Sequence, residues 1–245
     1  MELENNTVLA KGVHNTIKKV IKQLEFEDRT GVKQACPLKI EHLLKLFKAK
    51  DLNDQELLFA IIALVGHCGM LRTANLTDGL KVSDVTWAND FNSFSLMIHR
   101  SKTERKGGPR FLYFKRNGHS RVCPVLMMKK WFHRMKLWDR NDLALFPSIT
   151  RYGFNFNKSI SGDWIRKRIK QAATSLGLNP ADFSGHSLRS GGATDLFDAG
   201  VPFYAINKRG HWTSDAALLY YRDSLSADVM VFKAFSLLVD AKGRL

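Results

Sequence analysis

The sequence predicts a mainly helical α+β fold that carries one small antiparallel β-hairpin. Apolar residues recur at helical spacing before residue 90 and again after residue 124. Between them, residues 91–118 are strand-like on both sides of a turn signal, Gly107-Gly108-Pro109. A chain of 245 residues with 44% hydrophobic and 25% charged residues can also bury a sizeable core. We therefore expect helices in both halves of the chain and a hairpin between them.

The first element is a polar, nearly neutral helix within residues 12–30. The main domain boundary is expected near Arg29 to Pro37, because Pro37 opens a loop. The expected domains are a helical N-terminal segment at residues 1–34 and a larger domain at residues 35–245 that ends in a helix.

A short helix at residues 40–47 is expected next, followed by the most apolar helix of the chain. Asn53 or Asp54 can cap this second helix, because either side chain can accept a hydrogen bond from the first turn. The apolar run ends near Gly69, and another short helix is expected to begin near Arg72.

The second half contains the two strands of the hairpin and a series of helices. The strands are expected within residues 91–103 and 110–118. Gly200 and Gly210 are expected to end two consecutive helices, because glycine is favoured just after a helix C-terminus. The expected helices cover residues 125–138, 162–178, 184–199, 202–209, 213–223 and 226–245.

Charge is the most informative bulk property. The chain has 38 Lys and Arg against 23 Asp and Glu, a net charge of +15. Residues 100–140 hold 13 basic and 2 acidic residues, and residues 151–170 hold six basic and one acidic. Such an excess favours a polyanion such as double-stranded DNA, which releases counterions on binding. A membrane is not expected as a partner, because the basic residues are interleaved with strand and loop signals rather than set on one amphipathic helix. No apolar run approaches the ~18 residues of a span either.

Metal and disulfide chemistry is not expected. The three cysteines, Cys36, Cys68 and Cys123, form no C-x-x-C pair. Six histidines show no metal-ligand spacing and are expected to be surface or packing residues. They are His14, His42, His67, His99, His119 and His133.

The segment SGHSLRSGGATDLFDAG, residues 184–200, carries the strongest local signal. His186 and Arg189 are three residues apart, so on a helix they lie on one face. Such a pair alone is usually an ordinary surface feature, but here it stands at the start of a helix, where anions bind. Gly191 and Gly192 can let another backbone or a ligand approach closely, and we expect them to leave room for a DNA backbone.

Other residues complete a pattern around this segment. Arg72 precedes it in GHCGMLRTANL, Lys102 precedes it in SKT, and His211-Trp212 and Tyr220 follow it. This ordered set resembles the tyrosine recombinase (phage integrase) family from about Pro37 to Arg222. The pattern is most similar to recombinases of eukaryotic mobile elements, the DIRS-type retroelements and Cryptons. The resemblance implies the catalytic-domain fold of that family, DNA integration or recombination, and no metal or cofactor.

The resemblance also implies a role for each residue. Arg72 and Arg189 would bind the non-bridging oxygens of the scissile phosphate, and bidentate geometry suits arginine to this task. His186 would assist proton transfer from the nucleophile, and His211 would donate a hydrogen bond to the phosphate. Lys102 would act as general acid. Tyr220 would be the nucleophile that forms a 3′-phosphotyrosyl bond.

Two assignments remain open. Tyr221 is the alternative nucleophile, and only one of two adjacent tyrosines can face the phosphate on a helix. On the hairpin, Arg100, Arg105 and Lys106 are the alternatives to Lys102, and they could instead contact DNA phosphates. The expected DNA-binding residues are Arg100, Arg105, Lys106, Arg110, Lys115 and Arg116.

The chain departs from the family pattern at two places. Asn75 stands where many members have an acidic residue, which puts the orientation of Arg72 in question. Residues 1–34 are too short for a complete DNA-clamping domain and could be the remnant of one, or a linker. The resemblance further implies a dimer to tetramer on DNA through the C-terminal helix. It also implies a nuclear location if the source is eukaryotic, and a cytoplasmic one otherwise. Alternative functions are a catalytically silent DNA-binding domain and topoisomerase IB-like strand relaxation.

Overall fold

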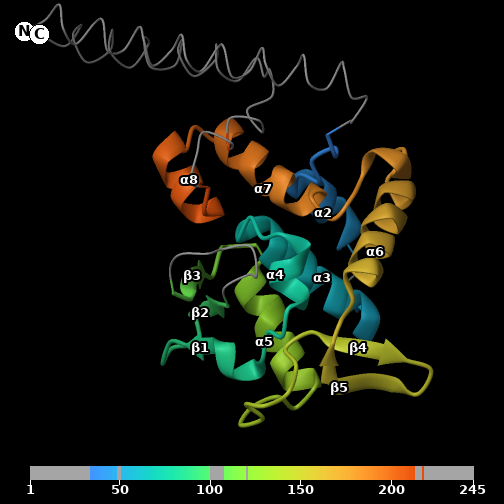
Figure 1. The fold of residues 1–245 in the computed structure, drawn as a ribbon, viewed down its shortest axis with the longest axis vertical. Coiled ribbons are helices and arrows are strands. Elements are labelled where there is room, and N and C mark those ends of the chain that lie inside the picture. The colour runs from blue at the N-terminus through green and yellow to red at the C-terminus, as the bar shows by residue number, and fades with distance from the viewer. Residues whose placement is uncertain (1–33, 49–50, 100–107, 120, 213–216, 218–245) are drawn as a thin grey trace, which may run out of the picture. The chain divides into compact units, whose positions relative to one another are not determined.

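The computed structural model describes residues 34–48, 51–99, 108–119, 121–212 and 217 (Figure 1). The chain divides into two compact units. One is Ala35–Leu196, and the other comprises Met1–Gln34 and Phe197–Leu245. The helices expected at residues 12–30, 213–223 and 226–245 lie outside the described residues, and the expected domain boundary stays a prediction.

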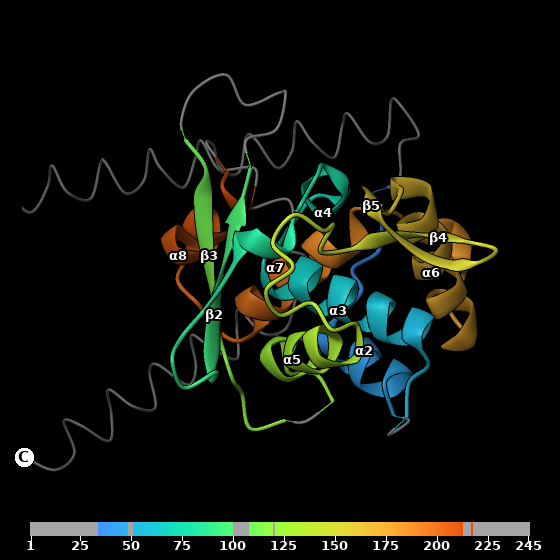
Figure 2. The ribbon, with the colours of Figure 1, turned by 90° about the horizontal axis from the view of Figure 1, so that it is seen from below.

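Helix α3, Asp54–Cys68, runs through the middle of the larger unit (Figure 2). Its first turn is closed by a reciprocal pair of hydrogen bonds. The Asn53 side chain accepts from the backbone N–H of Glu56 at 3.0 Å, and the Glu56 carboxylate accepts from the N–H of Asn53 at 2.8 Å. Every residue from Leu57 to His67 is buried, so the helix is surrounded on all sides. The expected cap and C-terminus are confirmed.

Short helices lie on either side of α3 in the sequence. Helix α2 is Ile40–Leu46, and α4 is Thr73–Thr77, which starts next to Arg72 as expected. The segment before α2 is fixed by three hydrogen bonds to later parts of the chain. The backbone N–H groups of Cys36, Leu38 and Ile40 donate to the Asp182 carbonyl, the Ser187 carbonyl and the Asp195 carboxylate, at 2.7, 2.8 and 2.6 Å.

The first sheet is antiparallel with the strand order β1-β2-β3. Strand β1 is Val85–Trp87, β2 is Ser93–Ile98 and β3 is Arg110–Lys115. Leu96 pairs with Val85 on one side and Leu112 on the other, and these three side chains are buried. The pairing of β2 with β3 confirms the expected hairpin strands, and β1, which follows the 3-10 helix Val82–Asp84, was not expected.

A second, two-stranded sheet is not among the elements expected from the sequence. Strand β4 is Pro147–Thr150 and β5 is Gly153–Ser159. Phe154 and Phe156 pack on Trp131 of helix α5, Pro124–Arg134, with ring centroids 5.5 and 6.5 Å apart. The two sheets lie apart, with α3 and α5 between them (Figures 1 and 2).

The remaining helices carry the basic and site residues. Helix α6 is Gly162–Ser175, and after a 3-10 turn at Pro180–Asp182 comes α7, Ser187–Asp198. Helix α7 therefore begins three residues later than expected, because Ser184–His186 form the turn that precedes it.

The smaller unit contains helix α8, Phe203–Gly210. Gly200 has a positive φ of 76°, as expected for a residue that ends a helix. Helix α8 ends at Gly210 as expected, although Gly210 is its last helical residue and the left-handed position falls on His211, with φ of 55°. None of the described helices is both long and apolar enough to cross a membrane.

Candidate active site

Arg72 is exposed at the N-terminus of α4, and a side chain of the same helix fixes its backbone. The Oδ1 atom of Asn75 accepts a hydrogen bond from the N–H of Arg72 at 3.1 Å. Asn75 is only 8% exposed, so this bond is shielded from water. The asparagine that departs from the family pattern thus caps the turn that presents Arg72.

Thr73 joins this turn to a segment far along the chain. Its Oγ1 donates a hydrogen bond to the carbonyl oxygen of Gly185 at 3.0 Å. A Cβ atom at position 185 would overlap the Thr73 hydroxyl, so the two segments approach as closely as glycine permits. This contact brings the residue after Gly185, which is His186, to the vicinity of Arg72. The sequence pattern did not predict a role for Thr73 or its contact with Gly185. The one available signal was the glycine at position 185, directly before the expected site residue His186.

Arg189 lies on the first turn of α7 and is almost completely buried, at 1% exposure. Its Nη1 donates to the carbonyl oxygen of Met70 at 2.5 Å. Met70 is itself buried and has a positive φ of 47°, which is uncommon for a residue with a side chain. This conformation turns the backbone just before Arg72 and lets its carbonyl meet the guanidinium.

His186 lies in the turn just before α7, and its backbone N–H donates to Ser184 Oγ at 3.2 Å. Partial burial of the imidazole lowers the pKa of His186 from its ordinary 6.5, and the positive charges of Arg189 and Arg72 lower it further. The imidazole is therefore neutral at neutral pH and can accept a proton. Both arginines therefore lie close enough to His186 for their charges to act on it.

The prediction about the two glycines of α7 is wrong. A Cβ at Gly191 would overlap the carbonyl oxygen of Leu38, and a Cβ at Gly192 would overlap that of His67. The space beside these glycines is therefore filled by the protein's own backbone. Their role is to let α7 pack directly on α3 and on the segment before α2.

His67 is a packing residue, as expected. It is 4% exposed, and its Nδ1 lies 3.1 Å from the Leu38 carbonyl oxygen. Its Nε2 lies 3.0 Å from the Asp195 carboxylate of α7. Both ring nitrogens thus have partners, and the contact between His67 and Asp195 joins α7 to the end of α3.

His211 belongs to the smaller unit. Its left-handed backbone ends α8, and the next residue folds back so that the N–H of Trp212 donates to the Asn207 carbonyl at 3.1 Å. A Cβ at Gly210 would overlap the Trp212 ring, which explains a glycine inside the last turn. The assignment of His211 to the phosphate stays a prediction.

The hairpin residues are described in part. Arg110 begins β3 opposite Ile98, and Lys115 ends it opposite Ser93, followed by exposed Arg116. Just after β2, at the loop end of the hairpin, His99 Nε2 lies 2.8 Å from the carboxylate of buried Asp84. The other predicted residues lie outside the described residues: Arg100, Lys102, Arg105, Lys106, Tyr220 and Tyr221.

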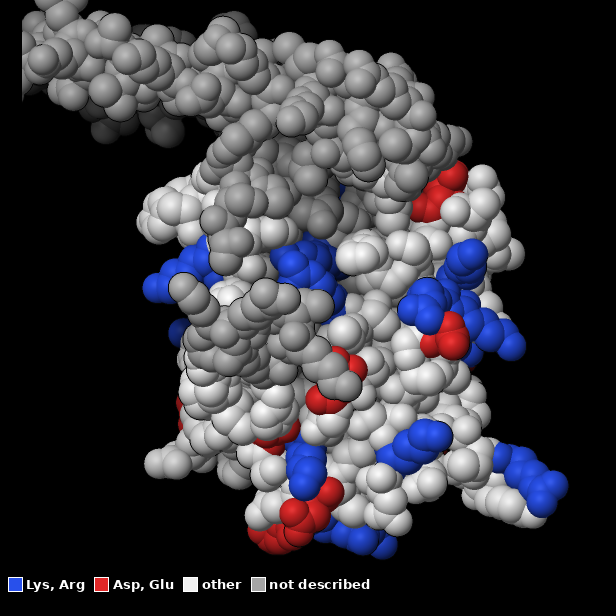
Figure 3. Space-filling view, in the orientation of Figure 1, with Lys and Arg blue, Asp and Glu red and all other residues white. Residues whose placement is uncertain are grey.

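Helix α6 carries a basic surface. The excess of basic residues at 151–170 was visible in the sequence, but none of them was predicted to bind DNA. Arg166, Lys167 and Lys170 are exposed, and Arg166 forms an ion pair with Asp163. Figure 3 shows Lys and Arg side chains gathered along this helix. The Cγ of Arg166 is 3.6 Å from the position of a Cβ on Gly185, so the basic surface starts beside the His186 turn.

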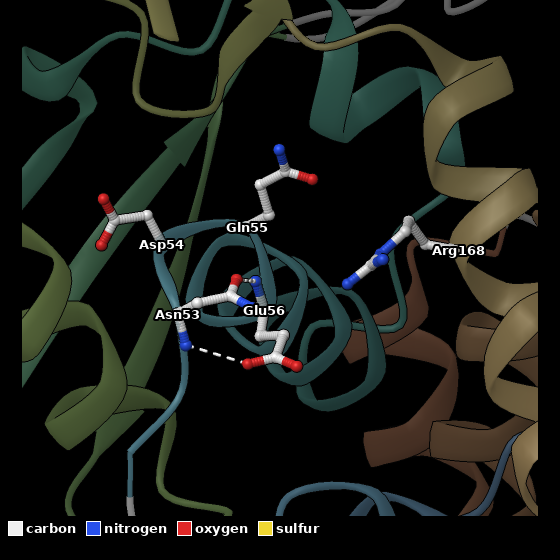
Figure 4. Close-up of a pocket in the computed structure, with 5 residues that line it drawn as sticks. All are labelled: Asn53, Asp54, Gln55, Glu56 and Arg168. Atoms are coloured by element: carbon white, nitrogen blue, oxygen red, sulfur yellow. Dashed lines mark hydrogen bonds between the residues drawn. The ribbon is translucent and has the colours of Figure 1, made fainter. Parts of the chain in front are cut away.

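A pocket at the N-terminus of α3 is a poor candidate for a phosphate-binding site (Figure 4). Its volume is about 450 Å³, and Asp54 and Glu56 supply two carboxylates to its lining. Arg168, on the opposite wall, stacks against the rings of Phe59 and Trp164. The carboxylates disfavour a phosphate. Within the described ranges, no cluster of three or more His, Cys, Asp or Glu side chains could hold a metal ion.

Comparison with known proteins identifies a family and several similar folds. Residues 38–227 match the model of the phage integrase family. Comparison with curated proteins gives no match. Among solved structures, the fold is similar to that of the XerA recombinase, with a TM-score of 0.58, 18% identity, and 83% of this chain and 66% of that chain covered.

Two DNA complexes are also similar in fold. The XerH site-specific recombinase bound to palindromic difH substrate gives a TM-score of 0.55 and 20% identity, with 77% of this chain and 50% of that chain covered. The Tn1549 transposon integrase in complex with transposon right end DNA gives 0.50 and 16%, with 82% and 67% covered. The chain thus spans half to two thirds of the length of these structures.

Proposed function

Because this chain belongs to the phage integrase family and has the fold of a tyrosine recombinase catalytic domain, we propose that it is a site-specific DNA recombinase. It would cleave and rejoin DNA strands through a 3′-phosphotyrosyl intermediate. The observation that carries the proposal is the hydrogen bond from Thr73 to Gly185, which places the backbone of Arg72 beside the turn of His186, with Arg189 on the helix that follows. These side chains would form a cationic site for one phosphate.

The arginines would stabilise the charge that grows on the phosphate in the transition state. Arg72 is exposed at a helix N-terminus, and Arg189 is held by the protein interior. A guanidinium that is already fixed needs little reorganisation when the charge develops. Arg189 would therefore supply a rigid donor and Arg72 a donor that meets the incoming DNA.

The covalent step would use Tyr220 as nucleophile. Its hydroxyl oxygen would attack phosphorus, forming the phosphotyrosyl bond, while the bond from phosphorus to the 5′ oxygen breaks. The tyrosine proton would pass toward neutral His186, and Lys102 would give a proton to the departing 5′ oxygen. His211 would hydrogen-bond a non-bridging oxygen. A free 5′-hydroxyl reverses the same steps and rejoins the strand without a cofactor.

DNA would bind on two basic surfaces that flank the cationic site. One is the β2–β3 hairpin with Arg110, Lys115 and Arg116, and the other is α6 with Lys167 and Lys170. Phosphate contacts of this kind supply affinity and register rather than sequence specificity. The hairpin residues Arg100, Arg105 and Lys106 would extend the first surface.

The biological setting is a further part of the proposal. The similarity of the motif pattern to DIRS-type and Crypton recombinases supports a mobile-element integrase that acts in the nucleus. The apolar sequence of residues 226–245 supports assembly of two to four copies on DNA. Both expectations rest on the sequence.

A suicide substrate tests the chemistry. A nick next to the cleavage site lets the short 5′-hydroxyl strand diffuse away, so the covalent protein–DNA adduct accumulates. The adduct should vanish in Tyr220→Phe and persist in Tyr221→Phe, and the reverse result would move the nucleophile to Tyr221. Absence of an adduct on DNA that the protein binds would favour the silent DNA-binding domain instead.

A further inference from the structure

Thr73 links the two halves of the cationic site although it would not itself touch the phosphate. Its hydrogen bond to the Gly185 carbonyl, 3.0 Å long, spans 112 residues of sequence. Thr73 directly follows Arg72, and Gly185 directly precedes His186. The bond therefore joins the backbone that carries one side chain of the site to the backbone that carries another.

The side chain of Thr73 has little room to move. Its hydroxyl meets Gly185 so closely that a Cβ there would overlap it. Its methyl group lies 3.3 Å from the position of a Cβ on Gly162, at the start of α6. A β-branched residue between two glycines on different elements is held in one rotamer. The backbone of Arg72 is therefore fixed relative to both α6 and the turn before α7.

The bond from Arg189 to Met70 also joins these segments, but it uses a guanidinium that the proposed function assigns to DNA. The Thr73 bond uses no phosphate-binding group. It can persist unchanged when DNA enters the site and when the product leaves.

We propose that Thr73 is a positioning residue whose hydroxyl holds Arg72 and His186 at the separation that binding of one phosphate requires. This inference rests on the proposed function of the site. It also provides its own reporter, because the charge of Arg72 is one cause of the lowered pKa of His186. Movement of Arg72 away from the imidazole raises that pKa.

The test compares Thr73→Val, which keeps the shape but lacks the donor, with Thr73→Ser, which keeps the donor. The pKa of His186 is measured by NMR titration of the full chain, and cleavage is measured in single turnovers on nicked duplex. Thr73→Val should raise the pKa toward 6.5 and slow cleavage by about 10- to 100-fold, because small displacements in a reacting site are costly. DNA affinity should stay near that of the wild type, and Thr73→Ser should restore both readouts.

Thr77→Val is the matched control on the same short helix. The Thr77 hydroxyl donates to the Thr73 carbonyl at 3.3 Å, so its loss weakens α4 without touching the contact to Gly185. An equal pKa and an equal rate in Thr73→Val and Thr77→Val would overturn the inference. A larger effect of Thr73→Val on both readouts supports it.

A second pair of substitutions tests the same contact in case the Thr73 variants fold poorly. Gly185→Ala should push the two segments apart, because the new methyl group overlaps the Thr73 hydroxyl. Adding Thr73→Ala removes the overlap, so the double variant should recover stability relative to Gly185→Ala alone. Its His186 pKa should stay above that of the wild type, because the hydroxyl donor is still missing. A wild-type pKa in the double variant overturns the inference. If wild-type protein forms no adduct, the proposed function fails, while the pKa comparison still decides whether Thr73 sets the distance.

Discussion

Arg189 and Met70 form a 2.5 Å hydrogen bond between a buried guanidinium and the carbonyl oxygen of a residue in the left-handed conformation. A buried cation is stable only where acceptors meet it. The strained backbone of Met70 supplies such an acceptor at the turn that also presents Arg72. Strain of this kind persists where the surrounding packing enforces it, which is common at functional sites.

Replacing Arg189 with lysine should separate packing from chemistry. A lysine amine can still donate to a carbonyl oxygen but cannot bind phosphate with a planar fork. We expect single-turnover cleavage to fall by about 100-fold or more, the usual effect of losing one fixed donor in a charged transition state. Arg140→Lys, at an exposed position, is the control. Wild-type cleavage by Arg189→Lys would contradict the assigned role.

The lowered pKa of His186 predicts a pH dependence of stability. Near and below pH 6.5 the unfolded chain binds a proton at this residue that the folded chain does not. The free energy of unfolding therefore falls as the pH drops through 6.5 toward the folded pKa, and this loss is absent well above 6.5. His186→Gln should lose less stability between about pH 8 and about pH 5 in denaturant titrations. An equal loss in both proteins would argue against the lowered pKa.

Alanine at position 192 should destabilise the fold rather than weaken DNA binding. The added methyl group overlaps the His67 carbonyl oxygen, and forced overpacking costs about 1–3 kcal/mol. Thermal unfolding should show a clear drop in midpoint. Gly118→Ala, where nothing lies within 4 Å, is the matched control. A loss of DNA affinity at unchanged stability would instead restore the view that these glycines face DNA.

Asn75 should be replaceable by aspartate but not by leucine. Aspartate can accept the N–H of Arg72 as asparagine does, and a negative charge suits the first turn of a helix. Leucine lacks an acceptor and should cost about 1 kcal/mol, the usual net contribution of one hydrogen bond. Unfolding and cleavage of the two variants are compared. Equal behaviour would show that the backbone of Arg72 does not depend on this side chain.

The basic surface of α6 should show itself in the salt dependence of DNA binding. Changing Lys167 and Lys170 to glutamine removes two exposed cations from one face of the helix. Affinity for duplex DNA should drop, and the slope of log affinity against log salt should shrink by about one for each phosphate that the variant no longer neutralises. Lys48→Gln, at an exposed position near the end of α2, should leave the slope unchanged. An unaltered slope in the double variant would remove α6 from the interface.

The sequence predicted the features of the fold that depend on neighbouring residues. The cap at Asn53, the strands on both sides of the hairpin turn and the start of α4 follow from neighbouring residues, and the structure confirms them. The pair His186 and Arg189 was visible from its spacing. The β4–β5 hairpin was missed although Phe154 and Phe156 alternate with asparagines, a strand signal in a short segment.

Long-range packing could not be predicted in the same way. Nothing near Gly191 or Gly192 in the sequence says that the Leu38 and His67 carbonyls fill the adjacent space. Glycines beside a phosphate motif therefore suggested a ligand. The contact between Thr73 and Gly185 was hidden for the same reason, because its partners are separated by most of the domain.

The segment at residues 36–40 has a mechanical consequence. Three of its backbone amides are tied to the residues around and within α7, so it behaves as a short tether on the helix that bears Arg189. Removal of these residues would therefore take three hydrogen bonds away from the turn before α7, from its first residue and from Asp195 in its last turn.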